Sequence, residues 1–199
     1  MLDNIPIIAS PNVVQVYNFY LDKAIQIAQT NKGATVLKTD CHNESNIYTQ
    51  SKPIIPHIWN DVNVFSLEQD ASVIKKALHN IGNKNWVVKQ GDIRNIPYDN
   101  DQFDILMDFS TIDHVCADDL PKVVAEYRRV TKPSAKFMIV VWTDSNRKCA
   151  RWPGQFFFSK DYFENQLNKH NFTIKSYNLL WKHPENHNEK LYIYEGVVK

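Results

Sequence analysis

The sequence has little glycine, with five residues among 199. Turns that hold phosphate groups usually need glycine, because it lets the backbone come close to the ligand. After the first predicted strand the chain reads Lys-Thr-Asp-Cys-His-Asn-Glu over residues 38–44. The Gly-x-Gly-x-x-Gly turn of dinucleotide-dependent oxidoreductases is absent from that place. The sequence therefore disfavours an enzyme of that class.

The sequence also has few cysteines and almost no net charge. The three cysteines, an odd number, do not make a disulfide framework, and they predict a reducing compartment such as the cytoplasm. Lysine and arginine together number 23 and acidic residues 22, so the formal net charge is +1. Without a basic stripe, no large nucleic-acid surface is expected.

Long apolar runs are missing. The longest, FMIVVW over residues 137–142, is far too short to span a bilayer. Residues 1–12 lack the basic region and the apolar stretch of a signal peptide. We therefore expect a cytoplasmic protein without a membrane partner, whose length suffices for one domain with a real core.

The spacing of apolar residues and the turn signals predict strands and helices in alternation. Helices are expected over 13–30, 71–82, 118–130 and 159–172, and strands over 34–39, 62–69, 86–92, 103–110, 135–144, 173–181 and 189–198. Residues 42–60 are expected to be irregular, because Pro53 and Pro56 break a long helix. The pattern predicts an α/β domain with a mainly parallel sheet, helices on both faces and a terminal hairpin. Residues 1–33 would form a helical cap and 34–199 the core of this single domain.

Short motifs follow one another in a fixed order from the third predicted strand onward. They are Gly91-Asp92-Ile93, Ile96-Pro97, Phe103-Asp104 and His114-Val115, followed by LPKVVAEYRRVTKPSAKFMIVVW over residues 120–142. This series resembles the class I S-adenosylmethionine (SAM)-dependent methyltransferases of the methyltransferase type 11-like group, over roughly residues 34–180. The resemblance implies a three-layer, Rossmann-like methyltransferase fold. Its seven-stranded sheet would have the order 3-2-1-4-5-7-6, with strand 7 antiparallel.

The same resemblance implies SAM as the cofactor and assigns residues to it. Glu68, at the end of the second strand, would accept both ribose hydroxyls, since a carboxylate offers two acceptor oxygens. Asp92 would accept from the adenine amino group, and Ile93 would pack on the ring. The ordinary alternatives are a solvated acid near a helix start for Glu68 and a turn-capping acid for Asp92.

Ligands of open parallel sheets bind beyond the carboxyl ends of the strands, where the strand order reverses. This rule places the site beside residues 39–43, 68–69, 92–93 and 108–110. The further candidates for cofactor binding are Thr39, Asp40, Cys41, Gln69, Asp108 and Phe109.

The family's first motif, Asp/Glu-x-Gly-x-Gly-x-Gly, is replaced over residues 38–44, so its acid and its glycines are lost. Side chains alternate along a strand, so Lys38 and Asp40 would share a face if the strand persists. Asp40 could then face the ammonium and sulfonium of SAM. Asn43 and Glu44 would fix the loop through bonds to its backbone. Alternatively, Asp40 and Asn43 only cap a turn and the pocket is closed.

His114, just past the fourth strand, is the candidate general base, with Asp113 as a second catalytic candidate. Methyl transfer needs alignment of the acceptor and, where the acceptor starts protonated, a base. Histidine titrates near neutral pH, which suits that task. A packing histidine is the alternative. Tyr17 and Tyr20 would form a lid, or would simply pack.

The methyl acceptor is predicted by elimination to be a small molecule, because motifs of DNA, cytosine-C5 and arginine methyltransferases are absent. Arg147, Lys148 and Arg151 could bind an anionic acceptor from the loop 143–155, or the loop is merely solvated. His183 and His187 lack companions for a metal site. Two other interpretations stay open: a non-catalytic relative that has lost SAM binding, and a different nucleotide ligand in the same crevice. The oligomeric state is not predicted.

Overall fold

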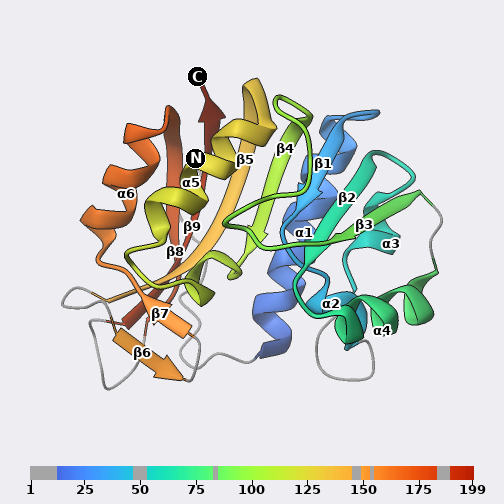
Figure 1. Cartoon of the computed structure of the whole chain (residues 1–199), viewed down its shortest axis with the longest axis horizontal. Helices are drawn as coiled ribbons and strands as arrows, with labels where there is room; N and C mark the ends of the chain where they lie inside the picture. Colours follow the sequence, from blue (N-terminus) through green and yellow to red (C-terminus); the bar gives the residue numbers. More distant parts are fainter. Residues whose placement is uncertain (1–12, 47–52, 83–84, 145–148, 153–154, 183–188) are drawn as a thin grey trace.

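The computed structural model describes residues 13–46, 53–82, 85–144, 149–152, 155–182 and 189–199. Within them, seven strands form one sheet in the order β3-β2-β1-β4-β5-β9-β8 (Figure 1). These strands are β1 (Thr35–Lys38), β2 (Asn63–Glu68), β3 (Trp86–Gln90), β4 (Phe103–Phe109), β5 (Thr131–Asp144), β8 (Phe172–Lys182) and β9 (Glu189–Val198). The strand order reverses between β1 and β4, which is where ligands bind in sheets of this type.

The sheet has the predicted topology. Neighbours among β1 to β5 pair in parallel, and β9 runs antiparallel to both β5 and β8. Counted within this sheet alone, β8 and β9 are strands 6 and 7, so the order is the predicted 3-2-1-4-5-7-6. The labels differ because β6 (Cys149–Trp152) and β7 (Gln155–Phe157) form a separate two-stranded sheet. That hairpin was not expected, since the segment reads as a loop.

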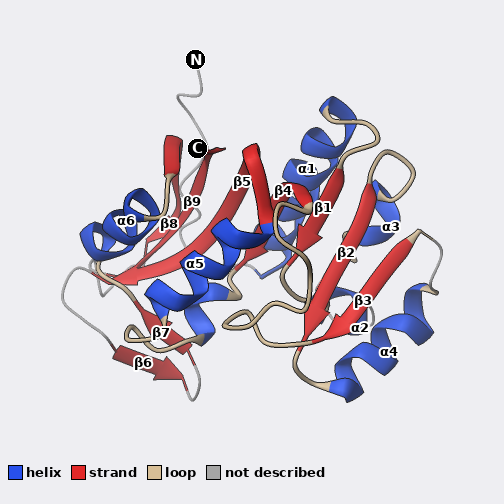
Figure 2. Ribbon diagram, turned by 45° about the horizontal axis from the view of Figure 1, so that its top comes forward, coloured by secondary structure: helices blue, strands red, loops and turns tan. Residues whose placement is uncertain are grey.

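Helices cover both faces of the sheet (Figure 2). Side chains of α1 (Val13–Thr30), α3 (Ile55–Ile58) and α4 (Ala71–Ile81) share one core cluster, and those of α5 (Leu120–Val130) and α6 (Lys160–Lys169) share the other. The alternation along a strand divides the residues between the two clusters. In β4, Ile105 and Met107 belong to the cluster of α1, and Leu106 belongs to the cluster of α5. Hydrophobic cores on both faces therefore fix the register of the central strands.

Local capping residues set the helix ends that the sequence predicted. The side chain of Asp70 accepts from Ser72 N at the start of α4, and Ser159 accepts from Tyr162 N at the start of α6. Gly82 ends α4 with φ 77°, a conformation that glycine adopts without strain.

Two expectations about boundaries are corrected. The segment 42–60 contains two single-turn helices, α2 (His42–Ser45) and α3, instead of being irregular throughout. Pro56 lies in the first turn of α3, where its missing N–H costs nothing, so a residue taken as a breaker begins a helix. Strand β5 starts at Thr131, directly after α5, and not at residue 135.

Within the described residues, no helix combines the length and the apolar character needed to cross a bilayer. Some residues singled out in the sequence lie outside the described residues, namely Arg147, Lys148, His183 and His187. The side chain of Arg151 is also not described.

Candidate active site

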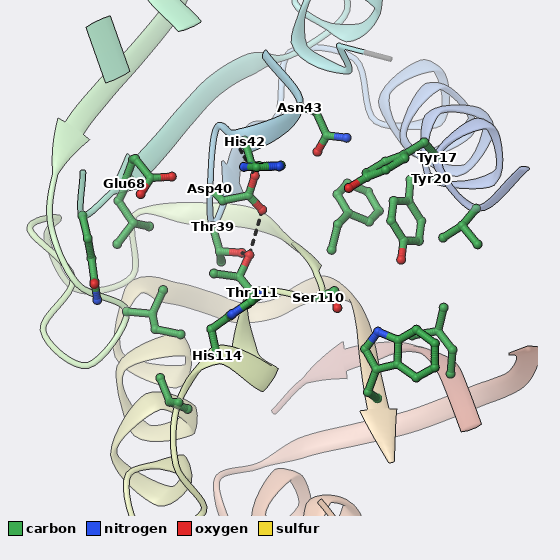
Figure 3. Close-up of a pocket in the computed structure, with 18 of the residues that line it drawn as sticks. Tyr17, Tyr20, Thr39, Asp40, His42, Asn43, Glu68, Ser110, Thr111 and His114 are labelled. Atoms are coloured by element: carbon green, nitrogen blue, oxygen red, sulfur yellow. Dashed lines mark hydrogen bonds between the residues drawn. The ribbon is translucent and has the colours of Figure 1, made fainter. Parts of the chain in front are cut away.

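A cavity of about 570 Å³ opens beyond the carboxyl ends of β1, β2 and β4 (Figure 3). This volume falls in the range of sites that hold small molecules and cofactors. The cavity wall brings together many of the predicted site residues, namely Thr39, Asp40, Glu68, Gln69, Ile93, Phe109 and His114. Segments far apart in the sequence thus meet at the reversal in strand order. The expected alternative of a closed pocket does not hold for this structure.

Cys41 and Asp92 were also predicted to bind the cofactor, but neither lines the cavity. Cys41 is fully buried in the core cluster of α1, and burial raises the pKa of its thiol. The carboxylate of Asp92 is instead bound by the Arg94 guanidinium, with Nη2 to Oδ2 at 2.6 Å. Hydrogen bonds from Arg94 hold the pKa of Asp92 below its usual value. Asp92 is thus directed along its own turn and away from the cavity wall.

Asp108 and Asp113 lie behind the wall and not on it. Both are completely buried. Asp108 Oδ1 accepts from Thr111 N at 2.8 Å, its Oδ2 accepts from the Tyr127 hydroxyl, and Asp113 Oδ2 accepts from Ser110 Oγ at 3.0 Å. Both carboxyl groups therefore support the turn after β4, which contains the 3₁₀ helix η1 (Ile112–His114).

The turn after β4 places polar groups on the cavity wall. Ser110 has φ 67°, a left-handed backbone conformation that is strained for serine and recurs at functional sites. Thr111 and the exposed side chain of His114 reach the same wall from this turn. Figure 3 shows Thr111 facing Asp40 and His114 on the lower side of the cavity.

A buried ion network replaces the glycine-rich loop at the end of β1. The Lys38 side chain has no exposure, and its Nζ lies 2.8 Å from Asp40 Oδ1 and 3.3 Å from Glu44 Oε2. Burial alone would lower the pKa of Lys38, but the charges of Asp40 and Glu44 outweigh it and raise that pKa. Glu44 Oε1 also accepts from Ile54 N and Ile55 N at the start of α3. The network therefore ties β1 to α2 and α3.

Asp40 joins this network to the cavity. Its Oδ1 accepts from Lys38 Nζ and His42 N, and its Oδ2 accepts from Thr111 Oγ1 at 2.7 Å. Burial alone would raise the pKa of Asp40, but the Lys38 charge and these hydrogen bonds hold it below its usual value. Asp40 is thus a charged group on the wall at neutral pH. A carboxylate oxygen has two lone pairs, so capacity for a ligand remains.

The wall opposite Glu68 is aromatic (Figure 3). Tyr20 of α1 stacks on Phe109, with ring centroids 4.7 Å apart, and Tyr17 meets Tyr20 edge to face at 5.6 Å. Burial, aided by Tyr17 and nearby carboxylates, raises the pKa of Tyr20 well above its usual value, so its hydroxyl stays neutral. Because Tyr20 is buried, it belongs to the fixed wall and does not act as a lid.

Several wall residues were not singled out for binding, above all Thr111, Trp142 and Leu191. Trp142 lies near the carboxyl end of β5, and the rule that placed the other residues would have extended to it. Leu191 comes from the antiparallel strand β9, where that rule does not apply. Only the pairing of Leu191 with Trp142 across β5 and β9 brings it to the site.

The fold and the cavity at the reversal of strand order define a Rossmann-like α/β domain of the kind that binds a nucleotide-containing cofactor. Residues 54–139 match the family model described as a methyltransferase domain. The match covers less than half of the chain and confirms the predicted resemblance over those residues. The matched residues begin after the rebuilt segment 38–44. A comparison with curated protein sequences finds no significant match.

Solved structures agree in fold. A SAM-dependent methyltransferase from Aquifex aeolicus has a TM-score of 0.67 and 16% identity, with 96% of this chain and 95% of that chain covered. A SAM-dependent methyltransferase from Methanosarcina mazei has a TM-score of 0.67 and 14% identity, with 87% of this chain and 96% of that chain covered. Geranyl diphosphate C-methyltransferase from Streptomyces coelicolor has a TM-score of 0.70 and 8% identity, with 89% of this chain and 76% of that chain covered. At these identities the likeness shows the architecture.

The charge of the cavity fits the cofactor that this family implies. Among the described wall residues there is no lysine or arginine, whereas Asp40 and Glu68 are both acidic. SAM carries a sulfonium and an ammonium, so acidic and aromatic walls complement it. Glu68 Oε1 accepts from Asp70 N at 3.1 Å, and its other oxygen can accept from a ligand.

Proposed function

We propose that this protein binds SAM in the cavity and transfers its methyl group to a small-molecule acceptor. One observation carries the proposal: the cavity stays open where the glycine motif is lost, and its wall joins Glu68, Asp40 and His114. The domain match supplies the family, and the chemistry of the wall supplies the fit. When bound, SAM provides a methyl group that is already activated for displacement.

The wall suggests how the cofactor lies. Glu68 would hold the ribose hydroxyls at the end of β2, and Ile93, which is buried, would pack against the adenine ring. Asp40 would face the positive groups of the methionine part. The turn after β4 and the aromatic wall would then hold the acceptor.

The residues of this chain would align the acceptor and exclude water from the reacting groups. Phe109, Tyr20 and Trp142 would exclude water from the reacting groups and orient the acceptor. His114 would take the proton of an acceptor that starts protonated, since its side chain is exposed on the wall. Asp108 and Asp113 act through the turn that carries His114, so we assign them a positioning role.

Substitution of Glu68 tests the proposal. Glu68→Gln keeps an oxygen for Asp70 N but removes the charge, so the affinity for S-adenosylhomocysteine should fall about tenfold or more. Isothermal titration calorimetry measures this. Glu195→Gln is the matched control, because Glu195 of β9 pairs with Lys23 of α1 and lies outside the cavity wall. Equal affinities in all three proteins would remove Glu68 from the site.

The other interpretations differ in measurable ways. A non-catalytic relative that has lost SAM binding would show no thermal stabilisation by SAM or S-adenosylhomocysteine up to millimolar concentrations. A protein for a different nucleotide would be stabilised by adenosine or ATP and not by SAM. An enzyme would bind SAM and release S-adenosylhomocysteine when supplied with its acceptor. The cytoplasmic location stays a prediction from the cysteine content.

A further inference from the structure

Asn43 carries a buried polar group that the protein itself does not satisfy. Its side chain is 2% exposed and lines the cavity. The amide nitrogen Nδ2 has no hydrogen-bond partner among the described residues. Leaving a buried donor unpaired is costly, so each such group in a folded protein calls for an explanation, such as a bound ligand or water. Because Asn43 also lines the cavity, its amide is a candidate donor to a bound molecule.

The backbone around Asn43 is held firmly. Glu44 Oε1 accepts from Ile54 N at 2.8 Å, and Asn80 Nδ2 donates to both Glu44 O and Ser45 O at 3.1 Å. The amide thus has a defined position before any ligand arrives, which lowers the entropic cost of binding. Figure 3 shows the amide between His42 and Tyr17, on the same side of the cavity as Asp40.

Charges near Asn43 indicate what it would bind. The carboxylate of Asp40 lies on the same wall and attracts a cation, while the amide nitrogen of Asn43 is a neutral donor that suits an anionic oxygen. An α-amino acid group presents an ammonium and a carboxylate a short distance apart. Such a zwitterion would satisfy both side chains at once. In the proposed function, only the methionine end of the cofactor has this chemistry.

We propose that Asn43 Nδ2 binds the α-carboxylate of the cofactor while Asp40 faces its ammonium, so that side chains replace the lost glycine loop. This inference rests on the proposed function and deepens it. It gives Asn43 a role in selecting ligands that carry an intact amino acid group. The ribose and adenine contacts do not depend on Asn43.

Two ligands distinguish the contact of Asn43 from the contacts to ribose and adenine. S-adenosylhomocysteine has the amino acid group, whereas 5′-methylthioadenosine keeps the adenosyl thioether and lacks that group. Asn43→Ala should weaken binding of S-adenosylhomocysteine about tenfold to a hundredfold, the usual effect of losing a donor to a charged group. Binding of 5′-methylthioadenosine should stay within about twofold. Asn43→Asp should weaken S-adenosylhomocysteine further, because two carboxylates would then meet.

Asn80→Ala is the matched control. It removes an amide that holds the same loop but does not line the cavity, so a loss of S-adenosylhomocysteine affinity as large as that of Asn43→Ala would assign the effect to the order of the loop and not to the Asn43 donor. Calorimetry on the full chain, with the melting temperature of each variant, gives the ratio of the two affinities. A ratio that neither Asn43 variant changes overturns the inference and leaves the proposed function standing. Failure of the wild-type protein to bind either compound overturns both.

Discussion

Asp108 is a buried acid whose ionisation bears on stability. Burial raises its pKa to about 6, although hydrogen bonds from Tyr127, Thr111 and Ile112 partly oppose the shift. The unfolded chain has the ordinary value of 3.8. A raised pKa means that the folded state binds the proton more tightly than the unfolded state. The contribution of Asp108 is therefore fully present below about pH 4 and is lost as the pH rises to about 6.

Asp108→Asn should remove this pH dependence. Between about pH 4 and pH 6, the free energy of unfolding of the variant should rise relative to wild type by about 3 kcal/mol, then stay level. Taking the difference in unfolding free energy between the two proteins cancels the contributions of groups that do not interact with Asp108. Urea unfolding at several pH values measures it. A constant difference over this range would contradict the burial of an ionising Asp108.

Some side-chain positions follow from the sequence and others do not. The alternation of a strand predicted that Lys38 and Asp40 share a face, and their side chains are in contact although β1 ends at Lys38. Cys41 does not follow this alternation, because it lies in the same core cluster as Val36 although the two are five residues apart. The capture of Asp92 by Arg94 depends on the bend of a short turn, which no periodicity encodes. Candidate sites at strand ends are thus predictable, while the direction of each side chain beyond the strand is not.

One buried cation, Lys38 of β1, pairs with both Asp40 and Glu44. Lys38→Met would leave the carboxylates of Asp40 and Glu44 without their partner, so the free energy of unfolding should fall by about 3–5 kcal/mol. Urea unfolding measures the loss. Lys136→Met is the control: this exposed lysine of β5 donates to Asn31, and its removal should cost less than about 1 kcal/mol. Equal losses in the two variants would mean that the network adds no stability.

Long elements were predictable because periodicity accumulates along them. The sequence places α1 and β9 at the residues where the structure has them, and Asp70 and Gly82 mark the ends of α4. Single-turn helices such as α2 and α3 have too few residues to show a period, so their segment reads as irregular. Tertiary bonds, above all those of Glu44 to the start of α3, decide their conformation.

The whole sheet should not exchange its amide hydrogens evenly. Strands β3 and β8 lie at its edges, whereas β1, β4 and β5 have partners on both sides and largely buried side chains. Amides without a neighbouring strand open to solvent more easily. Hydrogen exchange followed by mass spectrometry should therefore show peptides from β4 and β5 as the slowest, and those from β3 among the fastest of the strands. Slower exchange in β3 than in β4 would contradict the strand order.

The buried Lys38 also limits which single substitutions the fold can tolerate at positions 40 and 44. Restoring glycine at position 40 or 44 would remove a counter-charge from a cation that has no access to water. Placing an acid at position 38 first would instead crowd three carboxylates into one enclosed space. Either order passes through a folding-impaired intermediate, so positions 38, 40 and 44 must change together. A mutant library meant to introduce a glycine-rich loop here would need to randomise all three at once.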